Sequence, residues 1–162
     1  MLRTPIAMGH DFVKYEGHGE RFHDGVLWIL RHFLLAEARS MESARADSDT
    51  AELRTFIEKW DWLCPGVVTG TDLSEFVRKS PSRWQMMLEL LQRTGDRIAY
   101  FGEAIPKDYL QANAEKANLG VRYNDDIPTR RLLTDIGRLC RLLSEDEPLV
   151  AAVVVVEDED ED

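Results

Sequence analysis

The sequence predicts a mainly α-helical, single-domain bundle of about five to seven helices. Apolar residues recur at helical spacing in three long segments, and residues that start or end helices flank them. The length of 162 residues suits one domain with a core of its own. A small β element, which includes the valines at 153–156, completes the prediction, because β-branched residues favour strands.

The amino-terminal part combines an irregular segment with a central helix. Residues 1–19 contain several glycines and histidines, and we expect an irregular entry segment with a short strand over 11–15. A helical globular domain is expected over residues 20–156. Its first helix begins near Glu20, because apolar residues from Phe22 to Met41 form two adjacent helical stripes. So wide an apolar surface places this helix at the centre of the core.

The next two helices are indicated by their ends. Asp49 and Glu52 have the spacing of a capping box and predict a helix that starts near Asp49. The Cys-Pro-Gly sequence at 64–66 stops this helix. A short helix is predicted after Thr71, which is interpreted as its N-cap.

The clearest helix of the chain lies between Ser80 and Gly95. Ser80 is a favourable N-cap, Pro81 fits the first helical position, and Gly95 is interpreted as the residue that closes the helix. Residues 97–105 follow, and their pattern fits either a strand or a further helix.

Two prolines mark the remaining helices. Pro106 opens a helix predicted to run to about Asn118, and Pro128 opens one that runs to about Leu143. The apolar residues 149–156 are predicted to form a terminal strand, paired within the chain or with another chain. Residues 157–162 are predicted to be an acidic, disordered tail.

The negative charge is concentrated near the carboxyl end. The net charge is −10, yet nine of the 30 acidic residues lie at 145–147 and 157–162, beyond the last basic residue. The other 21 acidic residues are nearly balanced by the 20 basic residues, so the body of the chain is nearly neutral. A DNA mimic needs acids spread over its whole surface, and a nucleic-acid binder needs a basic stripe, so neither class is favoured.

One helix nevertheless collects positive charge. Four arginines fall within the predicted helix at 128–143, and we interpret them as a solvated face that pairs with nearby acids. The four residues are Arg130, Arg131, Arg138 and Arg141.

The two cysteines and the hydropathy pattern indicate a cytoplasmic protein without a membrane anchor. Cys64 and Cys140 lie in apolar surroundings without metal-site spacing, and we interpret them as buried free thiols, with a disulfide between them as the alternative. The longest uncharged apolar run has eight residues, far below the ~20 that a membrane-spanning helix needs.

All four histidines lie between residues 10 and 32, and they form the best candidate for a metal site. His10, Asp11, His18 and His23 are the potential ligands of one divalent ion such as zinc or iron. On a single helix, His32 would lie opposite His23, so His32 is interpreted as a packing or surface residue. The alternative for the whole cluster is hydrogen-bonded histidines without metal.

The candidate partner-binding residues are one aromatic segment and the acidic tail. Tryptophan is enriched in binding hot spots, and Trp62 lies off the apolar stripe of its predicted helix. Acidic residues can steer a basic partner. The full candidate set is Trp60, Asp61, Trp62, Glu157, Asp158, Glu159, Asp160, Glu161 and Asp162.

Three functional hypotheses remain open at this point. The first is a small, soluble, noncatalytic protein-binding protein, such as an inhibitor, an immunity or antitoxin-like protein, or an adaptor. It needs no cofactor and acts through its helical surface on another protein, for which a basic partner is one option. The second is a metal-dependent, hydrolase-like enzyme that uses the histidine cluster. The third is a structural or assembly component, and the sequence leaves a homo-oligomer open.

Overall fold

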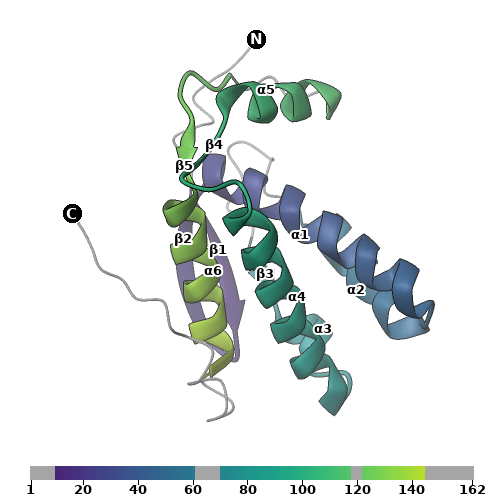
Figure 1. Cartoon of the computed structure of the whole chain (residues 1–162). Coiled ribbons are helices and arrows are strands. Elements are labelled where there is room, and N and C mark those ends of the chain that lie inside the picture. Colours follow the sequence, from purple (N-terminus) through teal and green to yellow (C-terminus); the bar gives the residue numbers. More distant parts are fainter. Residues whose placement is uncertain (1–9, 61–69, 118–121, 145–162) are drawn as a thin grey trace.

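The computed structural model describes residues 10–60, 70–117 and 122–144 (Figure 1). Within these ranges the chain forms six helices and a few short strands, which confirms the mainly α-helical class with a small β element. The elements follow the order β1 (His10–Tyr15), β2 (His18–His23), α1 (Asp24–Arg45), α2 (Ser48–Glu58), β3 (Gly70–Asp72), α3 (Ser74–Val77), α4 (Pro81–Ala99), β4 (Ala104–Ile105), α5 (Lys107–Lys116), β5 (Ile127–Pro128) and α6 (Thr129–Ser144).

Residues 10–23 form a β-hairpin, whereas the sequence pattern predicts an irregular segment followed by the start of a helix. Glu16 and Gly17 have φ angles of 50° and 85°, and such a two-residue turn has the twist that paired strands require. The strand predicted over 11–15 is confirmed by β1. The helix start near Glu20 is wrong, because residues 18–23 form β2 and α1 begins at Asp24. The irregular segment expected over 1–19 likewise gives way to strand from residue 10.

The hairpin is part of a small mixed sheet, in which β1 is the central strand. The strand order is β2–β1–β3, with β1 antiparallel to β2 and parallel to β3. One face of the hairpin is apolar and fully buried through Val13, Tyr15 and Phe22. Helix α6 packs along the hairpin and also along α4, so it closes the core between them (Figure 1).

Helix α1 is central, as its two apolar stripes predict, and it packs against α2 and α4. It ends where Ala46 adopts a left-handed φ of 53°. The N-cap of α2 is Asp47 and not Asp49, because the Asp47 carboxylate accepts hydrogen bonds from Thr50 N and Thr50 Oγ1, both at 2.8 Å. The N-cap therefore lies two residues before the predicted capping box at Asp49.

Helix α4 starts with Pro81 in its first turn, as predicted, but Gly95 does not end it. The helix continues to Ala99, and Gly95 lies within it opposite α6. A Cβ built on Gly95 would stand 3.8 Å from Ile136 and Leu133, so the glycine lies at the α4–α6 contact. The sequence pattern at 97–105 fits either a strand or a helix. In the structure, this segment contains the last turn of α4 and then the short strand β4.

The last two helices agree with the sequence. Pro106 immediately precedes α5 and α6 starts directly after Pro128. Strands β4 and β5 form a two-stranded antiparallel ladder between these helices. Cys140 is buried on α6, and burial raises the pKa of its thiol to about 11. Cys64 and the predicted strand at 149–156 lie outside the described residues.

One arginine fastens α6 to the hairpin. Arg138 Nη2 donates to Glu20 Oε1 at 2.9 Å and to the Arg21 carbonyl at 2.6 Å. Its guanidinium carbon lies 4.1 Å from the centre of the Phe22 ring. Arg138 Nη1 also donates to Asp135 on the same helix, at 3.2 Å. The contact joins residues that are 118 positions apart in the chain.

Candidate functional site

The hairpin register separates the predicted metal ligands. His10 is the cross-strand partner of His23, but His18 pairs with Tyr15 at the opposite end of the hairpin. Five register steps lie between these two pairs, which amounts to about 16 Å along the strands. His18 therefore cannot bind the same ion as His10 and His23.

For the other three candidate ligands of that hypothesis, the structure describes the backbone register alone. Asp11 pairs with Phe22 in the register, and the side chains of His10, Asp11 and His23 lie outside what the structure describes. Among the described residues, no group of three or more His, Cys, Asp or Glu side chains is arranged to hold a metal.

The predicted partner-binding residues are described only at Trp60. Its side chain is 5% exposed and packs edge-on against Phe56, with the ring centres 5.6 Å apart. Trp60 thus belongs to the core. Asp61, Trp62 and the six acidic residues 157–162 lie outside the described residues.

A different surface feature stands out between α1, α4 and α5. It is a hollow of about 510 Å³, which we call the α1–α4–α5 hollow. At its rim Tyr100 is 93% exposed and is the only large hydrophobic residue found exposed among the described residues. The lining residues are Phe33, Glu37, Arg93, Asp96, Arg97, Tyr100, Phe101 and Tyr109.

Three aromatic rings form the apolar wall of the hollow. The Phe33 and Tyr109 rings are stacked, with centres 6.1 Å apart and planes 8° apart. Phe101 meets both rings edge-on, at 5.7 Å from Phe33 and 5.1 Å from Tyr109. Phe33 belongs to the buried stripe of α1, Phe101 follows α4, and Tyr109 lies in the first turn of α5, so three segments fix one aromatic cluster.

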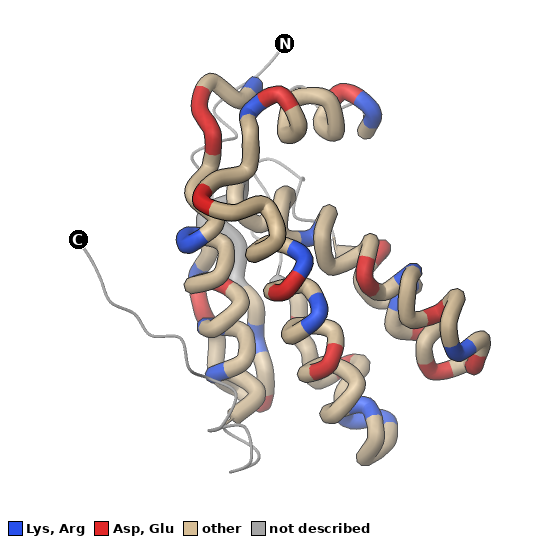
Figure 2. Tube along the Cα trace, in the orientation of Figure 1, with Lys and Arg blue, Asp and Glu red and all other residues tan. Residues whose placement is uncertain are grey.

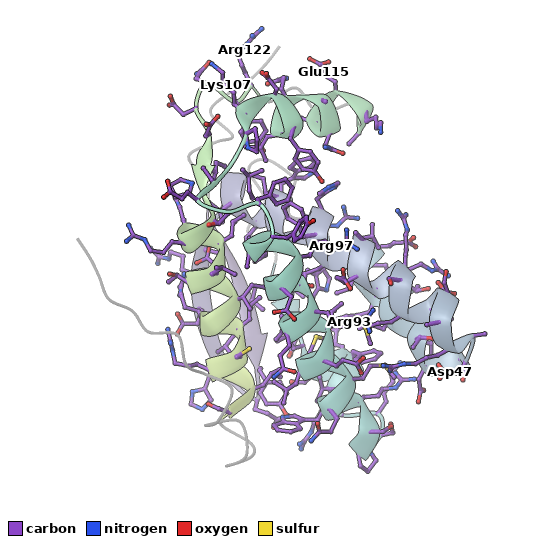
Figure 3. All side chains as sticks on the ribbon, viewed as in Figure 1. Asp47, Arg93, Arg97, Lys107, Glu115 and Arg122 are labelled. Carbon is purple, nitrogen blue, oxygen red and sulfur yellow. The ribbon has the colours of Figure 1, made fainter. Side chains whose placement is uncertain are left out.

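The polar side of the hollow is built on a buried glutamate. Glu37 is 7% exposed, and its carboxylate accepts hydrogen bonds from Arg93 Nε at 3.1 Å and from Arg97 Nε. Figure 3 labels the two arginines, which project from α4 toward α1. They are one helical turn apart, so a single carboxylate can hold both. Their guanidinium groups stay partly exposed at the rim.

The outer nitrogens of Arg97 remain available. Its only hydrogen bond within the described part of the chain is the one from Nε to Glu37. A guanidinium that is held at Nε can present its two terminal nitrogens as a fixed pair of donors to a carboxylate or a carbonyl group. The rim therefore combines an oriented arginine with an exposed tyrosine.

His32 lies behind the aromatic wall. Its Nε2 atom is 3.1 Å from the hydroxyl oxygen of Tyr109, and its ring stacks on Trp28. Burial lowers the pKa of His32, and the positive charges of Arg97, Lys116 and Arg39 lower it further. The imidazole is therefore neutral at pH 7, which agrees with its interpretation as a packing residue.

The His32–Tyr109 pair lies behind the aromatic wall of the hollow. Burial raises the pKa of Tyr109, so both members of the His32–Tyr109 pair are uncharged near neutral pH. Among the described residues, no carboxylate is hydrogen-bonded to His32 to orient it as a general base. The hollow offers aromatic faces and hydrogen-bond donors.

The shared position of the α4 residues in this hollow was not predicted, because Gly95 is interpreted in the sequence as a helix end. That interpretation separates Arg93 from Arg97 and Tyr100, whereas the continuous helix places them on consecutive turns. The spacing of Arg93, Arg97 and Tyr100–Phe101 is the signal that points to a shared helix face.

No protein-family model, curated protein or solved structure matches the chain. Across the described residues, none of the helices has the length and apolar character needed to cross a bilayer.

Proposed function

We propose that this protein is a noncatalytic protein-binding protein, and that the α1–α4–α5 hollow is its binding site. The observation that carries the proposal is the exposure of Tyr100 beside a hollow lined by aromatic rings and arginines. Tyrosine and arginine are enriched among the residues that dominate binding energy, and a concave apolar wall can receive a partner side chain. We further propose that the protein is cytoplasmic, as the sequence leads us to expect.

The fixed geometry of the rim also supports binding. Glu37 holds Arg93 and Arg97 in place before a partner arrives, and the aromatic wall is packed from three segments of the chain. Prior ordering of such side chains reduces the conformational entropy that is lost on binding. A side chain with a carboxylate or carbonyl group next to an apolar surface fits this combination.

Site-specific photocrosslinking in the native cell tests the proposal. A photoreactive phenylalanine derivative replaces Tyr100 in one variant and Gln85 in a control. Both positions are exposed: Gln85 lies on α4 and Tyr100 directly follows its last residue. They are 15 residues apart, or about 22 Å along the helix axis. We expect one crosslinked species from position 100 and none from position 85.

A second substitution makes the test specific to the hollow. Arg97→Ala should weaken the crosslink from position 100, and Tyr100→Ala should weaken the affinity for the isolated partner by about tenfold or more, as for a hot-spot residue. Equal crosslinking from positions 100 and 85 contradicts the proposal. A crosslinked product with the mass of two copies of this chain supports the alternative of an assembly component.

A further inference from the structure

Helix α6 carries a continuous basic face on the outside of the fold. At 100° per residue, Arg130, Arg131, Arg138 and Arg141 fall within about 100° of the helix circumference, with Thr134 between them. The opposite side is apolar and buried, through residues such as Leu132 and Leu139. Figure 2 shows the basic positions along the outer side of α6. We call these four arginines and Thr134 the α6 basic face.

Most of this face is not neutralised by the rest of the described fold. Arg138 is paired with Glu20 and Asp135. Arg130, Arg131 and Arg141 are exposed and form no ion pair or hydrogen bond of their side chains with the described residues. Among the described residues, the sequence-based interpretation of a face paired with nearby acids is therefore seen at Arg138 alone.

Several other arginines of the described fold are held in ion pairs. On α1, α2 and α4, each of the following contacts at least one acidic side chain: Arg39, Arg45, Arg54 and Arg83. Three unpaired arginines on one helix face are thus a local excess of positive charge. A matching excess of negative charge exists at residues 157–162 of the same chain.

We propose that the acidic segment 157–162 of this chain binds along the α6 basic face. Six consecutive carboxylates complement the arginines in sign, and the lengths agree. From Arg130 to Arg141 the face is about 17 Å long at 1.5 Å per residue. Six extended residues cover about 20 Å.

The connection between the two parts is long enough. Twelve residues, 145–156, separate the end of α6 from the acidic segment. They span up to about 40 Å, whereas the whole of α6 is about 24 Å long. A tether of this length holds the segment near α6 at a local concentration in the millimolar range, so weak charge pairing is sufficient. The pairing is screened by salt and is strongest at low ionic strength.

The bound segment would shield the face from other anions. Deleting residues 157–162 should therefore expose the face to an external polyanion. This proposal differs from the expected steering of a basic partner by the same six acids, because a segment held on α6 is not free to steer. It does not depend on the α1–α4–α5 hollow.

The test measures the binding of fluorescently labelled poly-L-glutamate at low and at physiological salt. We expect the chain that lacks residues 157–162 to bind at least tenfold more tightly than the full chain at low salt. Adding Arg130→Gln, Arg131→Gln and Arg141→Gln to the shortened chain should abolish this gain. The matched control is Lys14→Gln, Lys79→Gln and Lys107→Gln, which removes three exposed charges elsewhere and should keep the gain.

Each other outcome overturns the proposal. An equal loss of binding in the arginine and the lysine variants means that net charge alone attracts the polyanion. An unchanged affinity after deletion means that the segment does not cover α6. A second readout is the amide NMR spectrum, in which the deletion should shift signals of residues 129–144 at low salt. A deletion effect that requires a dimer, seen by light scattering, also overturns the contact within one chain.

Discussion

Replacing Arg138 by methionine should separate the contribution of its guanidinium from that of its aliphatic stem. Methionine keeps most of the apolar contact with the hairpin but cannot donate hydrogen bonds. The variant loses the ion pair with Glu20, the hydrogen bond to the Arg21 carbonyl and the stacking over Phe22. These three contacts join α6 to β2, so the variant tests the docking of the hairpin.

The size of the effect follows from the exposure of each contact. The pair with Glu20 is partly exposed, at 25% and 43%, so it contributes about 0.5–1 kcal/mol. The carbonyl hydrogen bond contributes about 1 kcal/mol, and the cation–π contact about 0.5–1 kcal/mol. The free energy of unfolding should fall by about 2–3 kcal/mol, which lowers the melting temperature by about 5–10 °C for a chain of this size.

Thermal unfolding followed by circular dichroism measures this change. Lys107→Met is the matched control, because Lys107 is exposed on α5, away from the α6 basic face, and its side chain has no partner among the described residues. The control should melt within about 1 °C of the unmodified protein, as for surface substitutions in general. Equal melting temperatures for the two variants would show that the contacts of Arg138 with the hairpin do not stabilise the fold.

Three further predictions concern single side chains. Asp47→Ala should destabilise α2 by about 1 kcal/mol in urea unfolding, whereas Asp47→Asn should retain most of the cap, because an amide oxygen also accepts from Thr50. The lowered pKa of His32 means that the unfolded chain binds the proton more readily. The free energy of unfolding should therefore be highest above pH 6.5 and fall as the pH drops below it, and His32→Gln should reduce that fall. In a Cys64→Ser background, Cys140 should resist thiol reagents at pH 8 until the protein is unfolded by urea, because burial raises its pKa to about 11. Rapid labelling of the folded protein would contradict the buried position of Cys140.

The helices were predictable because their signals are local. Pro81 in the first turn of α4 and the apolar repeat from Leu132 to Leu143 depend on neighbours within a few turns. The end of α4 was not predictable from Gly95 alone. A glycine serves equally as a helix end or as a point of close contact, and only the position of α6 decides between them.

The hairpin and the hollow depend on contacts that the sequence does not display. Residues 18–23 fit a helical stripe through Phe22, but the turn at Glu16–Gly17 and the pairing with β1 outweigh that local pattern. The hollow joins Phe33, Arg97 and Tyr109, which lie far apart in the chain. Its residues have ordinary local patterns, so their common location could not be inferred before the packing of α1, α4 and α5 was known.

The distance in sequence between the hairpin and α6 has a consequence for the order of events during synthesis. Phe22 and Glu20 are made early, while Arg138 is added 118 residues after Glu20. At a translation rate of about 5–20 residues per second, the apolar face of the hairpin waits about 6–24 seconds for the helix that covers it. During this interval Val13, Tyr15 and Phe22 are not covered by α6. The nascent chain should therefore be most prone to aggregation, and most dependent on chaperones, until the last helix has been synthesised.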